Sequence, residues 1–132
     1  MNKNISKIND YLMKQLWMDF ELCRMDGGEI ALFGYFDEMG PTKVKITFKQ
    51  PYLVSCALFF TYEGNGEFLT FVEGEEAITI NKKYGVTKGN QIFRISNTNI
   101  PSEMHIIAEE LEIQIMEYQD DDKNKISDTR KG

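Results

Sequence analysis

The segment from Lys43 to Lys49 constrains the fold most, because polar and apolar residues alternate along it at every position. Val44, Ile46 and Phe48 share one parity, and the polar residues share the other. A two-residue period puts each set on one face of a β-strand, so this segment predicts a strand with one buried face. A chain that contains such a strand needs a sheet with at least one covered side.

Glycine-rich corners separate this strand from similar segments. Asp26-Gly27-Gly28 lies between two apolar runs, and so does Glu63-Gly64-Asn65-Gly66. Glycine adopts the positive φ angles of tight turns without a Cβ penalty, so both corners predict β-hairpins. Within the second of the strands that the first corner joins, Gly34 predicts a bulge or a close approach of the backbone to another segment.

Residues 53–62 carry apolar side chains on both parities, which predicts a central strand covered on both faces. Gln50-Pro51 just before them predicts an interruption of the strand. Shorter strands are expected within residues 77–80 and 91–96, separated by a long solvated loop over residues 82–90.

Residues 103–117 fit two structures. Met104, Ile107, Ala108 and Leu111 have helical spacing, whereas residues 111–115 alternate strictly. We favour a last strand over about residues 104–117, with a bulge near Ala108 and Glu109. A helix over residues 103–111 is the alternative.

Residues 4–16 have apolar residues at steps of three and four, which predicts one short N-terminal helix. Together with about seven or eight strands, this indicates a mainly β fold, either an antiparallel β-sandwich or a curled, barrel-like sheet. An α+β sheet with the helix across one face is the alternative. We expect a single domain over residues 1–117 and a disordered tail over residues 118–132, in which Ile126 is the only apolar residue from Gln119 onwards.

The formal charge of −6 belongs entirely to residues 1–117, because the acids and bases of residues 118–132 cancel. An acidic body repels phosphate backbones, which argues against a nucleic-acid partner and favours a basic protein. The longest uncharged stretch has 13 residues, fewer than the about 20 of a membrane-spanning helix. The N-terminus lacks the continuous apolar segment of a secretory signal, so we expect a cytoplasmic protein without a membrane partner.

The residues that commonly carry chemistry are scarce and scattered. The single histidine, His105, has no Gly-x-Ser-x-Gly turn near it, and Cys23 and Cys56 form no Cys-x-x-Cys pair. We therefore expect no catalytic residue, no metal and no cofactor, and two buried thiols rather than a disulfide. The sequence does not tell whether the two cysteines lie near each other.

Two charged groups have alternative interpretations. Glu110 and Glu112 share a face of the last strand, where a further acid opposite them would permit general acid–base chemistry; we interpret them as solvent-exposed charges. The lysine row is interpreted as protection of an edge strand rather than as an oligonucleotide surface. It consists of Lys43, Lys45 and Lys49, with Lys82, Lys83 and Lys88 as further candidates.

From these observations we expect a small, non-catalytic, acidic cytoplasmic protein that binds another protein, in the manner of an immunity protein or an inhibitor. A small-ligand-binding β module is the alternative, and an enzyme that uses carboxylates alone is a weaker one. A bare edge strand would also permit a homodimer. The aromatic residues that would line a ligand cavity are Phe59, Phe60, Tyr62, Phe68 and Phe71.

Overall fold

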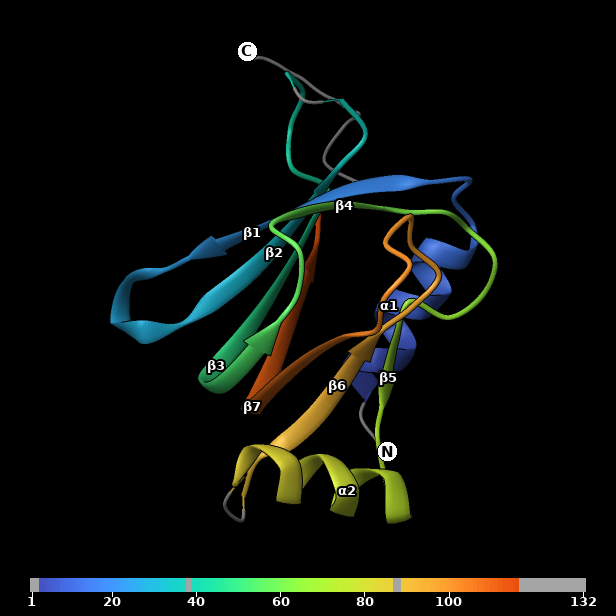
Figure 1. Cartoon of the computed structure of the whole chain (residues 1–132). Coiled ribbons are helices and arrows are strands. Elements are labelled where there is room, and N and C mark those ends of the chain that lie inside the picture. Colours follow the sequence, from blue (N-terminus) through green and yellow to red (C-terminus); the bar gives the residue numbers. More distant parts are fainter. Residues whose placement is uncertain (1–2, 38, 87–88, 117–132) are drawn as a thin grey trace.

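Seven antiparallel strands form one curled sheet in the computed structural model, which describes residues 3–37, 39–86 and 89–116. The strand order is β4-β1-β2-β3-β7-β6-β5, and the sheet bends into a half barrel with one helix inside the curl and another across one end (Figure 1). The mainly β, curled antiparallel fold is therefore confirmed. The elements are α1 (Lys3–Met13), β1 (Met18–Arg24), a 3-10 turn (Asp26–Gly28), β2 (Ile30–Tyr35), β3 (Val44–Ser55), β4 (Phe59–Tyr62), β5 (Leu69–Phe71), α2 (Gly74–Tyr84), β6 (Gln91–Ile95) and β7 (Met104–Ile115).

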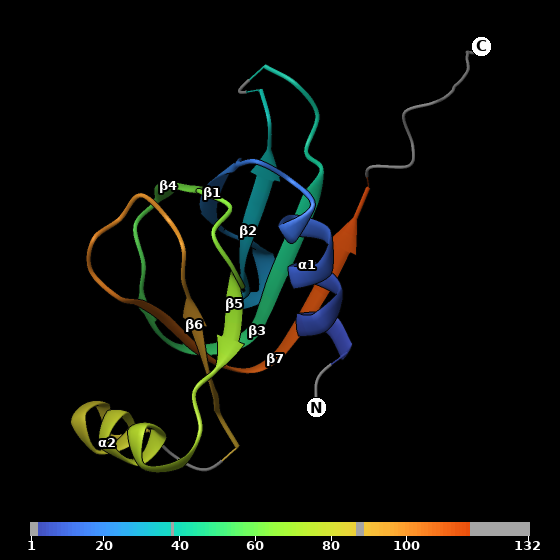
Figure 2. The same ribbon diagram turned by 90° about the vertical axis from the view of Figure 1, so that its right-hand side faces the viewer.

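Helix α1 lies on the concave side of the sheet, where it contacts β5 and β7 (Figure 2). Ile5, Ile8 and Leu12 recur at steps of three and four and are all buried against the sheet. This is the helix predicted for residues 4–16, and it ends at Met13. Burial of this apolar stripe, rather than intrinsic propensity, stabilises so short a helix.

Stacked aromatic rings fill the concave core. The Phe68 ring lies between other rings, 4.6 Å from that of Phe20 and 5.6 Å from that of Tyr62, centroid to centroid. Phe60 stacks on Phe20 at 5.6 Å. Phe60, Tyr62 and Phe68 are thus core residues. Their rings pack against one another rather than line a ligand cavity.

The side chain of Asn9 completes the outer edge of β5. Its Oδ1 accepts hydrogen bonds from the backbone N–H groups of Phe68 and Leu69, at 2.9 and 3.0 Å, and its Nδ2 donates to the Leu69 carbonyl at 2.8 Å. Asn9 is buried, so these bonds satisfy backbone groups that water cannot reach. One amide side chain thereby takes the place of a neighbouring strand.

The other edge strand, β4, is covered by the connection between β6 and β7. The Glu63 N–H donates to the Asn97 carbonyl and the Asn99 N–H to the Thr61 carbonyl, at 2.8 and 3.0 Å. With β5 closed by Asn9, neither edge strand in the described part of the chain offers a long free edge. The described edges therefore do not offer the bare strand that would permit a homodimer by edge pairing.

The corner Glu63-Gly64-Asn65-Gly66 does not form the predicted hairpin. Gly64 and Gly66 have positive φ angles, as expected, but β4 and β5 lie at opposite edges of the sheet. The segment instead crosses the open side of the curl, and Tyr62 at one end of it pairs with Thr98. Local turn chemistry was recognisable, whereas the pairing depends on the curl of the whole sheet.

The prediction of a central strand over residues 53–62 is also wrong. Residues 53–55 end β3, which continues through Gln50-Pro51 with a positive φ at Gln50 and a register shift between Pro51 and Leu53. The chain then turns and enters the edge strand β4. Apolar residues occur on both parities because two strands with different neighbours share the segment.

A second helix, α2, replaces the strand predicted at residues 77–80 and the first part of the loop predicted at residues 82–90. Glu75 and Glu76 lie in its first turn, Lys82 and Lys83 lie in its last turn, and Gly85 ends it with a left-handed conformation. These charges complement the helix dipole, and the glycine is a common C-terminal cap. The strand predicted over residues 91–96 is confirmed as β6.

Most of the other local predictions hold. Asp26-Gly27-Gly28 joins β1 to β2 as a hairpin, and the last strand is β7, which excludes a helix over residues 103–111. The bulge predicted in this last strand near Ala108 and Glu109 is wrong, because the register shift lies between Pro51 and Leu53 and the extra residue therefore belongs to β3. A Cβ on Gly34 would lie only 2.6 Å from the Met18 sulfur and 2.8 Å from the Phe20 ring, so the close approach is real. The predicted disordered tail, residues 118–132, lies outside the described residues.

Candidate binding surfaces

Helix α2 covers the convex, outer side of the sheet at the β5–β6–β7 end. Neighbouring strands present a row of apolar residues to it: Val72, Ile92 and Ile107, with Leu53 at the end of β3. Ala77, Ile80 and Tyr84 of α2 pack on this row. The Tyr52 hydroxyl adds hydrogen bonds to the carbonyls of Tyr84 and Gly85, at 3.2 and 2.8 Å. No residue of α2 is itself buried, so the helix rests on the sheet rather than within the core.

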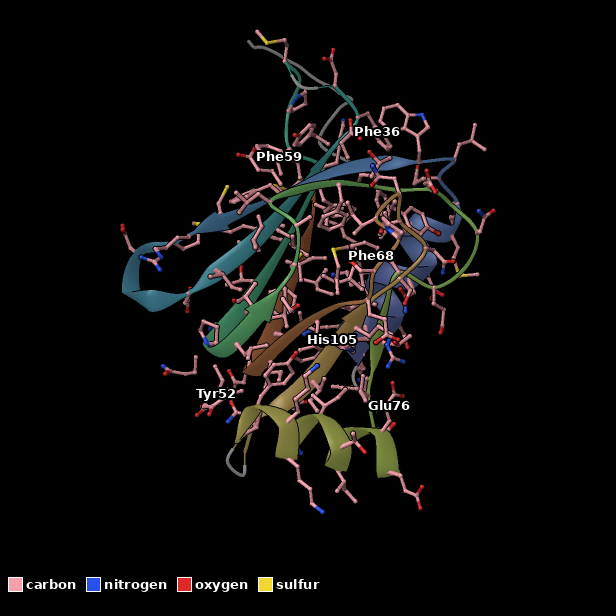
Figure 3. All side chains as sticks on the ribbon, in the orientation of Figure 1. Phe36, Tyr52, Phe59, Phe68, Glu76 and His105 are labelled. Carbon is pink, nitrogen blue, oxygen red and sulfur yellow. The ribbon has the colours of Figure 1, made fainter. Side chains whose placement is uncertain are left out.

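The adjacent row carries an ionic cluster. Arg94 of β6 and His105 of β7 are direct cross-strand neighbours, and the Arg94 guanidinium binds the carboxylate of Glu76 in α2. Glu103 lies 3.8 Å from Arg94 Nε and 3.5 Å from His105 Nε2. Neither nitrogen makes a hydrogen bond within the described residues. The cluster links α2 to the sheet, and Figure 3 shows His105 between the sheet and the helix.

His105 is only 8% exposed, and burial lowers the pKa of its imidazole from the usual value of 6.5. Glu103 opposes this change, whereas the positive charges of Arg94 and Lys83 reinforce it. A lowered pKa keeps the ring neutral near pH 7. The single histidine is therefore a neutral group that is buried on the outer side of the sheet.

A pocket of about 530 Å³ lies between the start of α2 and strands β5 and β6. Phe71, Val72 and Ile92 line its sheet side, and Ala77 and Asn81 line its helix side. The Asn81 Oδ1 is buried and accepts no hydrogen bond from a described residue. A buried acceptor left without a donor costs about 1–3 kcal/mol, so this atom favours any donor that reaches it.

Neither of the two described helices lies over the remaining outer side, from β4 through β1 to β2 (Figure 1). Strand alternation and the pairing of Glu21 with Phe33 and Phe59 put acidic and aromatic residues in contact. Phe59 is 61% exposed, and Figure 3 shows it at the outer edge of the sheet, away from the Phe68 core. We call this the acidic–aromatic surface: Asp19 and Glu21 of β1, Phe33 and Tyr35 of β2, and Phe59 and Thr61 of β4.

A shallow depression of about 310 Å³ lies within the acidic–aromatic surface. Tyr35 and Phe59 line it together with Asp19, whose Oδ1 accepts a 2.6 Å hydrogen bond from the Thr61 hydroxyl. The described outer positions of β1 and β4 carry no lysine or arginine. They are Asp19, Glu21, Cys23, Phe59 and Thr61.

The predicted carboxylates and lysines lie on the same outer side, farther along the sheet. Glu112 contacts Lys49 at 3.1 Å, and Glu110 is the cross-strand neighbour of Lys49, so a lysine rather than a further acid faces them. Hydrogen bonding to Glu112 raises the pKa of Lys49. The interpretation of the lysines as guards of an edge strand is wrong, because β3 is a central strand.

The other members of the lysine group lie elsewhere. Lys45 lies over the Phe33 ring, 5.7 Å from its centroid. Lys82 and Lys83 belong to α2, at the end of the sheet remote from Lys43 (Figure 1). Lys88 lies outside the described residues.

Both cysteines are free thiols, as expected, but they are half-buried rather than buried. Burial raises the pKa of Cys56 to about 12 and, with the nearby Glu21 charge, also raises that of Cys23. A raised pKa keeps a thiol protonated and unreactive near neutral pH. Within residues 3–37, 39–86 and 89–116, no three side chains of histidine, cysteine, aspartate or glutamate gather closely enough to hold a metal ion. None of the described helices has the length and apolar character needed to cross a bilayer.

No family model, curated protein or solved structure matches this chain significantly.

Sequence reasoning did not find the acidic–aromatic surface. Phe59 was assigned to a buried strand, and the outward position of Tyr35 depends on which strand lies beside it. The one available signal was the alternation of Asp19 and Glu21 with Phe20 and Leu22, which places both acids on one face.

Proposed function

We propose that this chain is a small, non-catalytic, acidic protein that binds a basic protein through the acidic–aromatic surface, in the manner of an immunity protein or an inhibitor. The observation that carries the proposal is the exposed Phe59 ring beside Glu21 on an uncovered sheet face. Burying a phenylalanine side chain contributes about 1.5–3 kcal/mol. Aromatic residues at the centre of an interface commonly dominate its binding energy.

The charge of the molecule supports a basic partner. The formal charge is −6, and both charged residues on the outer face of β1, Asp19 and Glu21, are acids. Complementary charge accelerates association and disfavours acidic competitors. We also propose a cytoplasmic location, because free thiols persist in reducing compartments.

The proposal is tested by affinity capture from the source cell, followed by calorimetry with the purified partner. Phe59→Ala is expected to weaken binding by about tenfold or more. Glu21→Lys is expected to slow association, most strongly at low salt. Ile78→Ala and Glu75→Lys, which change exposed residues of α2, serve as matched controls and should bind like the wild type.

Two results would contradict this function. One is a partner that binds Phe59→Ala and Glu21→Lys as tightly as the wild type. The other is a partner that is acidic and whose binding strengthens when Glu21 is reversed to lysine.

A further inference from the structure

The pocket beneath the start of α2 lies apart from the acidic–aromatic surface. It is formed by β5, β6 and α2, whereas that surface lies on β4, β1 and β2. Its volume of about 530 Å³ falls within the range of small-molecule sites. The floor is apolar, because Val72 and Ile92 are buried members of the cluster beneath α2. Such a floor suits the body of a small organic ligand.

The polar lining of the pocket consists of one carboxylate, Glu73, and three side-chain amides, Asn81, Asn90 and Gln91, which can each donate and accept hydrogen bonds. Asn81 lines it, and its Oδ1 is buried without a hydrogen bond from any described residue. Glu73, an exposed residue just before α2, is the one charged residue among those that line the pocket. Gln91 already donates its Nε2 to the Glu109 carbonyl at 2.8 Å. The combination of a carboxylate and an unpartnered acceptor favours a ligand that is a cation and a hydrogen-bond donor.

Neighbouring bases do not reverse this preference. Arg94, in the next row of the sheet, binds Glu76 and lies beside Glu103. Lys83 is in the last turn of α2, and its ammonium lies 5.2 Å from the centroid of the Tyr84 ring. Neither residue lines the pocket.

A donor can reach Asn81 Oδ1 only if α2 moves slightly, and this helix rests on the sheet rather than within the core. The helix has no buried residue, and glycines with positive φ angles, Gly74 and Gly85, stand at its two ends. Its packing onto the sheet uses Ala77, Ile80 and Tyr84. A shift of the helix by a fraction of a turn therefore leaves the main core intact.

We propose that this pocket binds a small organic cation with an apolar body. The body rests on Val72, Ile92 and Ala77. The ammonium or amidinium group faces the Glu73 carboxylate and donates a hydrogen bond to Asn81 Oδ1. This site is independent of the protein-binding function proposed above.

The test uses 2-phenylethylammonium as the probe, with 3-phenylpropionate and 2-phenylethanol as anionic and neutral counterparts. Backbone amide chemical shifts of the full chain are followed during titration up to about 10 mM, because small fragments bind weakly. The amine should shift the amides of Val72, Ala77, Asn81 and Ile92 saturably, and the carboxylate should bind at least about tenfold more weakly.

Variants separate the two parts of the site. Glu73→Gln should weaken the amine by about threefold to tenfold and leave the alcohol unchanged. Ala77→Leu fills the pocket and should abolish binding of all three probes. Ile78→Leu, an exposed neighbour in the same helix, is the matched control and should bind like the wild type.

The proposal is overturned by any of three results: no saturable shift with the amine, equal affinity for the amine and the carboxylate, or unchanged binding in Ala77→Leu. Unaltered amine affinity in Glu73→Gln also overturns the cationic ligand class. The far-ultraviolet circular dichroism of each variant must match the wild type, and Ala77→Gln replaces Ala77→Leu if the latter unfolds.

Discussion

Two regions on the outer side of the sheet differ in chemical character: the strands beneath α2 and the strands from β4 to β2. Beneath the helix, Ile107 of β7, Ile92 of β6 and Val72, just after β5, form a continuous apolar row. On the uncovered side, Phe59, Glu21 and Phe33 alternate between aromatic and acidic residues across three strands. One sheet thus uses the same backbone pairing to build an intramolecular contact at one end and an exposed mixed surface at the other.

The difference shows which apolar side chains are already buried within the fold and which are still exposed to solvent. Ile107 is fully buried and contributes to stability, whereas Phe59 retains most of its exposed area. Area that is still exposed remains available for association. The comparison therefore separates residues whose substitution should affect unfolding from residues whose substitution should affect binding.

The largest expected effect comes from removing a side chain beneath α2. Ile107→Ala should lower the free energy of unfolding by about 3 kcal/mol, since it deletes buried methyl groups and leaves a cavity. Phe59→Ala should change it by less than about 0.5 kcal/mol. Urea denaturation of both variants measures the two values. Equal losses would remove the distinction between the covered and uncovered regions.

A smaller effect is expected from pH, again beneath α2. The unfolded chain binds more protons than the folded chain below pH 6.5, because the pKa of His105 is lowered on folding. The stabilisation is complete above that pH and decreases as the pH falls towards the folded pKa, by at most about 1.4 kcal/mol per pH unit. Arg94 and Lys83 oppose the imidazolium, and Glu103 favours it.

His105→Gln is the variant that isolates this pH effect. The difference in unfolding free energy between wild type and His105→Gln, measured from about pH 8 to pH 5.5, should shrink as the solution becomes more acidic. Carboxylates titrate in both proteins and cancel in the difference. A difference that stays constant or grows on acidification would contradict a lowered pKa.

The smallest expected effect concerns the ion pair at the margin of the covered region. Glu76→Gln should cost less than about 1 kcal/mol, because Glu76 is half exposed and water competes for its charge. The loss should diminish further in high salt. Glu75→Gln, one position away in α2, provides the control. A loss comparable to that of Ile107→Ala would mean that the ionic cluster, not the apolar row, holds the helix.

Much of the sheet could be predicted because its signals are local. The alternation around Ile46 identified β3, and Asp26-Gly27-Gly28 identified the first hairpin. The close approach at Gly34 could be predicted because glycine weakens a strand and usually occurs there at a bulge or where another segment comes close. Each of these inferences needed only neighbouring residues.

The errors arose where the structure depends on distant segments. The residues between β4 and β5, Glu63-Gly64-Asn65-Gly66, are typical of a β-hairpin turn, yet the two strands lie at opposite edges of the curled sheet. The outward direction of Phe59 follows from its pairing with Glu21, 38 positions earlier in the chain. Likewise, Arg94 and His105 become neighbours only through the pairing of β6 with β7. Helix α2 was not predicted because its apolar stripe is short, consisting of Ala77, Ile80 and Tyr84, and is completed by residues of distant strands beneath it.

The bond network of Asn9 has a consequence for the order of assembly. Asn9 belongs to α1, whereas its partners Phe68 and Leu69 follow 59 and 60 positions later in the chain. Long sequence separations slow the formation of a contact. Until α1 docks, the backbone amides of β5 stay open to strands of other nascent chains. The speed of this docking therefore determines how long each newly made molecule is vulnerable to aggregation.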